Sequence, residues 1–103
     1  MDFAQLVAED RRLVILRLLA SAPGNSANDS MLHSGLLAIG HVCSRDQVRG
    51  DIAWLKEQGL LASEELTGIG SHSPIVTRLT ERGFDVQAGR STVPGVKRPT
   101  PHG

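Results

Sequence analysis

The sequence predicts a small, mainly helical α+β domain, in which three helices precede a β-hairpin and a fourth helix follows it. Three observations predict this class. The chain has 103 residues, which is about the size of one domain. Apolar residues recur at helical spacing in four segments, and two short strand-like runs stand between the third and the fourth. Because two strands alone form only a marginal sheet, the hairpin must pack on the helices.

Residues 3–22 are expected to form the first helix, with Asp2 as its N-cap and Pro23-Gly24 at its end. Nearly every position from 13 to 20 is apolar, so this helix is predicted to be central. The turn-forming residues 25–30 follow, with room for one very short extended piece.

The second helix is expected to start at Asn28 or Asp29, either of which can act as its N-cap, and to end near Gly40. The residues expected on its buried face are Met31, Leu32, Leu36 and Ile39.

The third helix is predicted at residues 45–57. Ser44 and Gln47 have the spacing of a capping box, and Gly59 is placed to end the helix. Its predicted buried residues follow at intervals of four and three: Val48, Ile52 and Leu55.

Residues 60–66 and 74–79 are predicted to be the hairpin strands, since the connection between them is rich in glycine and serine. Thr80 is expected to cap a fourth helix over residues 80–89, with Phe84 and Ala88 facing the core.

The domain is predicted to cover residues 1–90, followed by a basic, proline-containing tail at 91–103 that is extended or disordered. The formal net charge is zero, but it is unevenly distributed. Residues 1–85 hold 11 acidic and eight basic residues, whereas residues 86–103 hold three basic and no acidic residues. Any attraction for phosphate must therefore come from local patches and the tail.

The start of the chain lacks the basic, apolar pattern of a signal peptide, and no apolar run is long enough for a membrane span. The single cysteine, Cys43, cannot form an internal disulfide bond. We therefore expect a cytoplasmic protein without a membrane segment.

Over residues 3–89, the sequence resembles the winged helix-turn-helix transcription regulators of the MarR, ArsR and PadR type. Two motifs carry the resemblance: the series Ser44, Val48, Ile52, Leu55 and Gly59-Leu60-Leu61, and the segment Leu79-Thr80-Glu81-Arg82-Gly83. The sequence from the first helix through VPGVKRP is also similar to small winged-helix proteins of Mu-like prophages. The resemblance implies a winged helix in which residues 45–57 form the recognition helix and the hairpin forms the wing.

In such a fold the N-terminal residues of the recognition helix reach base edges in the major groove of double-stranded DNA. Arg45 or Arg49 is then expected to read guanine, Gln47 to read adenine, and Ser44 to hold a phosphate. Gly50 would let the DNA approach closely. The candidates for further phosphate contacts are Lys56, Arg78, Lys97 and Arg98.

A solvated helix surface is the alternative interpretation of Arg45, Arg49 and Lys56, because acidic residues on the same helix can pair with them. Glu64 and Glu65 on the first hairpin strand also disfavour phosphate unless they point away from the groove. Trp54, the only tryptophan, is expected in the core or in a subunit interface.

The sequence thus predicts a DNA-binding regulator, and a homodimer because two-fold symmetry doubles the contacts of a module with so little charge. The first helix, or the fourth helix with the tail, would supply the dimer surface. A winged helix that binds another protein, such as a phage or host factor, is the alternative. A third possibility, a metal- or small-molecule-responsive regulator, has only His41 and Cys43 to support it. No catalytic or cofactor-binding motif is present, so we expect neither an enzyme nor a cofactor.

Overall fold

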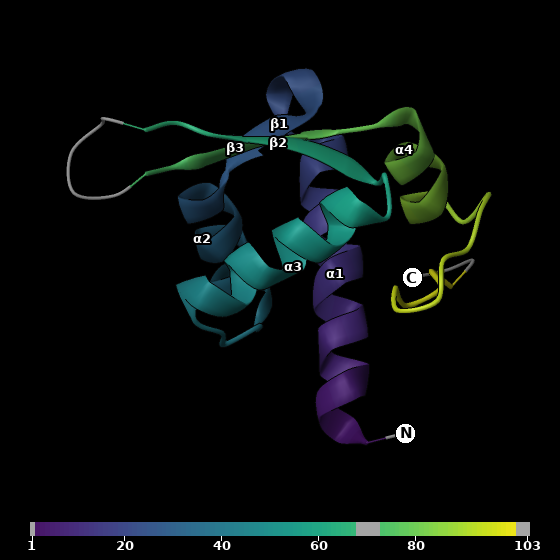
Figure 1. Cartoon of the computed structure of the whole chain (residues 1–103). Helices are drawn as coiled ribbons and strands as arrows, with labels where there is room; N and C mark the ends of the chain where they lie inside the picture. The colour runs from purple at the N-terminus through teal and green to yellow at the C-terminus, as the bar shows by residue number, and fades with distance from the viewer. Residues whose placement is uncertain (1, 68–72, 101–103) are drawn as a thin grey trace.

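The computed structural model describes residues 2–67 and 73–100 of the chain. Within them, four α-helices and a three-stranded antiparallel sheet form a small α+β structure (Figure 1). The elements in chain order are α1 (Phe3–Ser21), the 3-10 turn η1 (Pro23–Asn25), β1 (Ser26–Asn28), α2 (Asp29–Ile39), α3 (Arg45–Glu57), β2 (Leu61–Glu65), β3 (Ile75–Leu79) and α4 (Glu81–Gln87). The expected helices and hairpin strands are present, and β1 lies where the sequence allowed one short extended piece.

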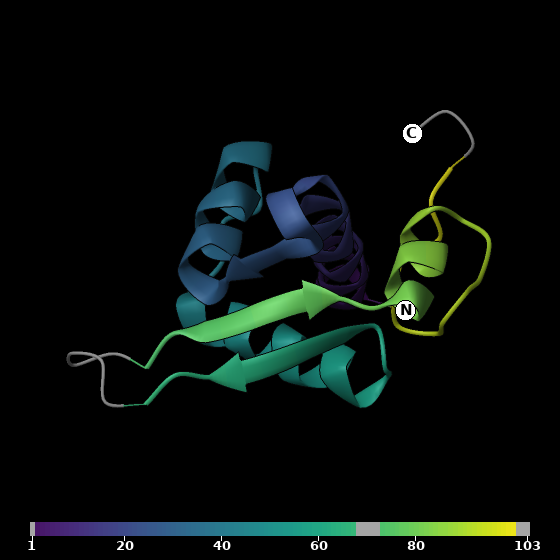
Figure 2. The same ribbon diagram turned by 90° about the horizontal axis from the view of Figure 1, so that it is seen from above.

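The strand order in the sheet is β1-β3-β2, so the second hairpin strand lies in the middle. The Thr77 hydroxyl on β3 is buried and donates a 2.7 Å hydrogen bond to the Ala27 carbonyl, while the Ser26 hydroxyl donates one to the Thr77 carbonyl. These bonds fix β1 to β3. Seen from above, the sheet crosses the helices, with α4 at one end of the hairpin and α2 toward the other (Figure 2).

Side-chain caps fix the starts of the four helices, as the sequence predicted. Asp2 caps α1, Thr80 caps α4, and Ser44 caps α3. For α2 the cap is Asn28, whose side chain accepts a 2.8 Å hydrogen bond from the Met31 amide. Asp29, the other candidate, is instead the first residue of α2 and is completely buried.

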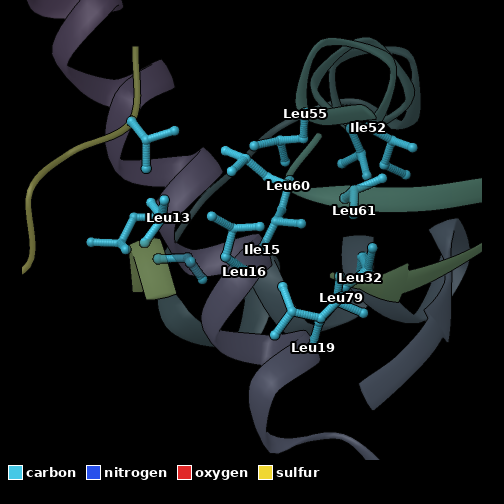
Figure 3. Packing of buried hydrophobic residues seen from close by; sticks show 14 of the residues in the cluster. Leu13, Ile15, Leu16, Leu19, Leu32, Ile52, Leu55, Leu60, Leu61 and Leu79 are labelled. Atoms are coloured by element: carbon cyan, nitrogen blue, oxygen red, sulfur yellow. The ribbon is translucent and has the colours of Figure 1, made fainter. Parts of the chain in front are cut away.

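The second half of α1 runs through the centre of the core (Figure 3). Leu13, Ile15, Leu16 and Leu19 are all buried there. The predicted buried residues of α3, Val48, Ile52 and Leu55, are confirmed. No helix among the described residues is long and apolar enough to cross a membrane.

Four residues that the sequence placed on the core side are exposed. Met31 and Ile39 are 60% and 57% exposed, because α2 buries only the narrow stripe of Asp29, Leu32 and Leu36. On α4, Phe84 is 40% exposed and Ala88 is also exposed, while Val86 is buried. The short α4 approaches the sheet through Gly83, whose position turns Val86 inward.

Residues 91–100 have no regular secondary structure, but they are not a free tail. Val93 and Val96 are buried in the core cluster, and the Lys97 amide donates a 3.1 Å hydrogen bond to the Glu9 carbonyl of α1. The packed structure therefore continues beyond the boundary predicted at residue 90, since two valines supply enough apolar surface to anchor the segment. Residues 101–103 of the predicted tail lie outside the described residues.

Candidate nucleic-acid interface

Helix α3 lies between α2 and strand β2, and one of its faces is open to solvent. Arg45, Arg49 and Lys56 follow one stripe of this helix, which lines its junction with the hairpin. We call this junction, formed by Arg45, Arg49, Lys56, Ser63, Glu65 and Ser73, the α3–hairpin seam. The neighbouring stripe consists of Asp46, Gly50, Ala53 and Glu57, all of them exposed. The basic residues of α3 thus point toward the hairpin, whereas the most exposed stripe is small and acidic.

The capping box engages both predicted contact residues at the start of α3. The Ser44 hydroxyl accepts a 3.1 Å hydrogen bond from the Gln47 amide, and Gln47 Oε1 accepts a 2.9 Å bond from the Ser44 amide. Reading adenine would need both the oxygen and the nitrogen of the Gln47 side-chain amide. Contact with adenine through Gln47 therefore has to share or replace the bond that its Oε1 accepts from the Ser44 amide.

Arg45 and Arg49 are brought together by Asp29 of α2. Arg49 Nη1 lies 2.9 Å from Asp29 Oδ2, and Arg45 Nη2 lies 3.5 Å from the same oxygen. The two arginine side chains remain 41% and 32% exposed. Arg49 also contacts Glu65 of β2 at 3.4 Å. The acidic partners of these arginines thus come from α2 and β2, whereas the sequence-based alternative expected acids of α3 itself.

Asp29 is a charged anchor for three elements. Its Oδ1 accepts a 3.1 Å hydrogen bond from the Ile75 amide at the start of β3, so one carboxylate joins α2, α3 and the hairpin. Burial by itself raises the pKa of this carboxyl group. The hydrogen bond from Ile75 and the two guanidinium groups outweigh burial, and the pKa of Asp29 is held below its ordinary value. Asp29 is therefore ionised near neutral pH.

Gly50 and Lys56 differ in their surroundings. A Cβ atom added to Gly50 would meet no atom within 4 Å, so packing inside the protein does not require glycine here. Lys56 Nζ donates a 3.2 Å hydrogen bond to the Ser63 carbonyl on the outer edge of β2. Lys56 thereby covers a carbonyl group of the edge strand β2, which gives it a structural role.

Arg78 is exposed on β3 and points to the sheet face away from the helices. It borders an open hollow of about 330 Å³, whose other lining residues are Ser26, Ala62, Ser63, Glu64, Val76 and Thr77. Glu64 on this face offsets the charge of Arg78. Glu65, one position further along β2, belongs instead to the α3–hairpin seam, because adjacent side chains of a strand point to opposite faces.

Lys97 and Arg98 are not close to the start of α3. They lie on the C-terminal segment beside α1 and α4, at the end of the molecule opposite α2 (Figure 1). Lys97 Nζ is 3.3 Å from Asp10 Oδ1, so its charge already has a partner. Arg98 is exposed beside Ala88 and Gly89. The structure therefore places Arg45, Arg49 and Lys56 in one seam, away from the basic residues Lys97 and Arg98 of the C-terminal segment.

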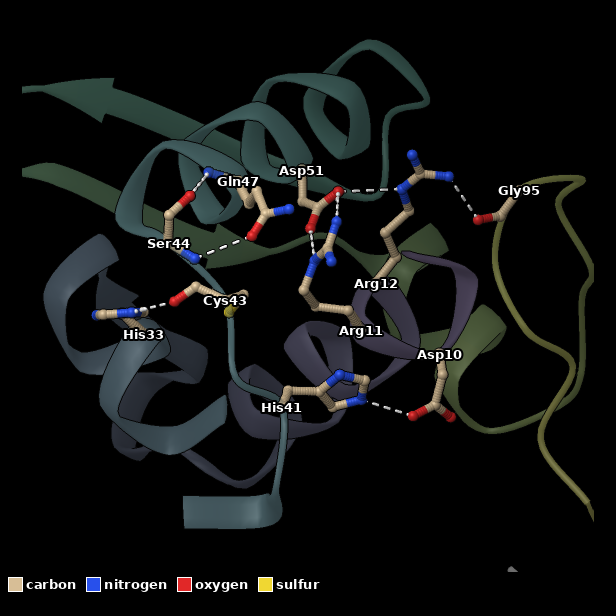
Figure 4. A network of polar contacts seen from close by, with 10 residues as sticks. All are labelled: Asp10, Arg11, Arg12, His33, His41, Cys43, Ser44, Gln47, Asp51 and Gly95. Atoms are coloured by element: carbon tan, nitrogen blue, oxygen red, sulfur yellow. Dashed lines mark hydrogen bonds and ion pairs between the residues drawn. The ribbon is translucent and has the colours of Figure 1, made fainter. Parts of the chain in front are cut away.

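A second buried carboxylate, Asp51, joins α3 to α1 (Figure 4). Arg11 and Arg12 of α1 both donate to it, and the Arg12 guanidinium lies 4.3 Å from the centre of the Trp54 ring. Arg12 Nη1 also donates a 2.9 Å hydrogen bond to the Gly95 carbonyl. Trp54 is thus half-buried between α1 and the C-terminal segment. Sequence reasoning missed this network, in which Asp51 is a buried acid on an otherwise apolar face.

The histidines near Cys43 have other partners. His33 Nε2 lies 2.7 Å from the Cys43 carbonyl oxygen, and His41 Nε2 lies 2.6 Å from Asp10 Oδ2 (Figure 4). Burial raises the pKa of the Cys43 thiol, which makes the thiolate less accessible. In the part of the chain that the structure describes, no group of three or more potential ligands is arranged to hold a metal ion.

Comparison with known proteins places the chain among phage proteins. No protein-family model matches it. It is 52% identical over 96 residues to the "uncharacterized protein gp26" of Escherichia phage Mu, an alignment that covers 93% of this chain and 94% of the phage protein. It is also 50% identical over 66 residues to an "uncharacterized protein" of Haemophilus influenzae, which covers 64% of each chain. The resemblance to Mu-like phage proteins is thereby confirmed, and the chain belongs to the family of the phage Mu protein gp26.

Proposed function

We propose that this protein is a winged-helix DNA-binding protein that acts as a regulator, with α3 as the recognition helix and the β2–β3 hairpin as the wing. The observation that carries the proposal is the α3–hairpin seam, where the half-exposed Arg49 contacts Glu65 and the Ser73 carbonyl of the hairpin. The half-exposed Arg45 shares Asp29 with it. The order of the helices and the strand order β1-β3-β2 also fit this architecture.

An α-helix fits the major groove, and a wing beside it contacts the adjacent backbone. A phosphate strand that crosses the seam would meet Arg45 and Arg49, while Gly50 on the exposed stripe leaves space for close approach. Phosphate contacts position a protein on DNA without reading sequence. The basic residues of the seam would therefore mainly position α3 on the DNA.

The test is a salt titration of binding to a fluorescent duplex of random sequence, with Arg45→Ala as the variant. This substitution leaves Arg49 on Asp29 and so keeps the buried carboxylate paired. Arg90→Ala is the matched control. Arg90 follows α4 and forms an exposed ion pair with Asp85, so this substitution removes the same charge from a different part of the surface. We expect Arg45→Ala to weaken binding about threefold to tenfold and to reduce the salt slope by about one, and Arg90→Ala to have little effect.

Two outcomes would refute the DNA proposal. One is the absence of binding at low salt. The other is an equal loss of affinity in the two arginine variants, because net charge and not the seam would then control binding.

The homodimer expected from the sequence remains part of the proposal. Phe3 and Leu6 are 78% and 48% exposed on the start of α1, which projects from the rest of the molecule (Figure 1). Sedimentation velocity should give a mass of two chains, and Phe3→Ser with Leu6→Ser should give one. A single-chain mass for the unchanged protein at micromolar concentration would exclude this surface.

Binding to a protein is the second candidate function, and exposed apolar residues at the end of α2 favour it. Leu37, Ile39 and Val42 are 45%, 57% and 92% exposed. A stoichiometric complex with a protein of a Mu-like phage would support it if Leu37→Ser with Val42→Ser abolishes the complex and Arg45→Ala does not. A complex that survives the double substitution would exclude this surface.

A further inference from the structure

The guanidinium group of Arg49 has an inner and an outer set of partners. On the inner side, Nη1 contacts Asp29 Oδ2 at 2.9 Å and the Ser73 carbonyl oxygen at 3.2 Å. On the outer side, Nη2 contacts Glu65 Oε1 at 3.4 Å. Arginine carries five N–H donors in a planar fork, so one guanidinium can keep the inner contacts while its outer partner changes.

The two carboxylates differ in how firmly they are held. Asp29 is fully buried, also bonds the Ile75 amide, and pairs with Arg45 as well. Glu65 is 53% exposed and makes the longer contact, and no second partner is shown for it in the part of the chain that the structure describes. Exposed ion pairs contribute little free energy and are easily exchanged, whereas a buried pair is costly to break. Glu65 is thus the displaceable partner.

We infer that Glu65 occupies the place of a DNA phosphate on Arg49 and is displaced from it when DNA binds. This inference rests on the proposed function. Carboxylate and phosphate oxygens are alternative acceptors for the same guanidinium donors, and both bind in the plane of the fork. Arg49 is then a phosphate contact and not a reader of guanine. Asp29 is its positioning residue, because it holds the inner edge of the guanidinium in both states.

Two consequences follow for binding. The free protein keeps Arg49 neutralised, so phosphate must replace an internal acid before it gains this contact. The cost is the same for every DNA sequence, because it concerns a backbone contact. Glu65 therefore weakens binding to random DNA, and removal of its charge should strengthen that binding.

The test compares Glu65→Gln with Glu64→Gln in the DNA titration described above. The two substitutions remove the same charge from adjacent positions on β2. Glu64 lines the hollow on the opposite sheet face and contacts no arginine of the seam in any contact shown among the described residues. We expect Glu65→Gln to tighten binding about twofold to fivefold at low salt, and Glu64→Gln to change affinity by less than half as much. The salt slope should change little, because Arg49 contacts phosphate in the bound state of both proteins.

Arg49→Ala provides a second test, since Arg45 still pairs with Asp29 in this variant. The gain from Glu65→Gln should disappear in the Arg49→Ala background. Thermal unfolding would check that this variant is folded, and if it is not, the comparison of the two glutamine variants decides alone.

The outcomes separate this inference from the DNA proposal. Equal tightening by Glu65→Gln and Glu64→Gln, or no tightening by Glu65→Gln, would overturn the role of Glu65 while the DNA proposal stands. Failure of all variants and of the unchanged protein to bind DNA at low salt would overturn both.

Discussion

Gly83 provides a direct test of how α4 packs on the sheet. A Cβ atom added at this residue would lie 2.0 Å from the Leu60 carbonyl oxygen and 2.7 Å from Leu79 Cδ1. The Leu79 side chain can move, but the Leu60 carbonyl is backbone and also accepts a 3.3 Å hydrogen bond from the Thr80 amide. Gly83→Ala must therefore push α4 away from the start of β2.

The required shift is at least 1 Å, because contacts of Cβ atoms below 3.0 Å are essentially never seen. Such a shift also loosens Val86, which is buried in the core. Overpacking of this kind costs about 3 kcal/mol. For a domain of this size, that loss lowers the midpoint of thermal unfolding by roughly 12–24 °C.

The matched control is Gly50→Ala, which adds the same methyl group to a helix where nothing lies within 4 Å. Alanine is the better helix former, so this variant should be more stable by about 0.5–1 kcal/mol. Thermal and urea unfolding followed by circular dichroism at 222 nm measure both effects. A Gly83→Ala protein that unfolds at the temperature of the unchanged chain would refute the packing of α4 described above. A destabilised Gly50→Ala protein would refute the open surface of α3.

Three further predictions concern the buried carboxylates and the C-terminal segment. Asp51→Asn should lower the free energy of unfolding by about 3 kcal/mol in urea, because it leaves two partly buried arginines without a charged partner; a loss below about 1 kcal/mol would contradict the network. Gly95→Ala should release the segment from Trp54, since its Cβ would lie 2.6 Å from the indole ring at a φ of +99°. We expect a red-shifted tryptophan emission with helix content retained, and unchanged emission would count against this contact. The folded-state pKa of Asp29 is lowered from 3.8, so its stabilisation is present above that pH and is lost as the pH falls through the lower value. Asp29→Asn should therefore flatten the loss of stability below about pH 4, and parallel pH profiles would refute this assignment.

Much of the fold could be predicted because the signals are local. The caps at Ser44 and Thr80 and the buried stripe of Val48, Ile52 and Leu55 depend on residues within about one helical turn of each other. Local spacing also located the two hairpin strands. Local spacing predicted the width of the buried face of α2 less well. Ile39 has the helical spacing of a buried residue, but it lies beyond the part of α2 that packs on the core.

The candidate site could be predicted only in part. The sequence placed Arg45 and Arg49 on one helix, but their environment depends on Asp29, 16 and 20 residues earlier in the chain. The sequence indicates Asp29 only as a candidate helix cap. A buried carboxylate at the start of a helix has the same local pattern as an exposed one, so spacing along the chain cannot distinguish them.

By itself, the sequence determined where the helices and hairpin strands lie, which side of α3 is buried, and that α3 carries basic residues near its start. Only the tertiary structure decided that these basic residues line a seam with the hairpin, that Glu65 faces Arg49 while Glu64 faces away, and that residues 93–97 pack on α1. The physical reason is the range of the interactions. Caps and stripes are set within one helical turn, whereas ion pairs across elements form only after hydrophobic packing has brought distant residues together.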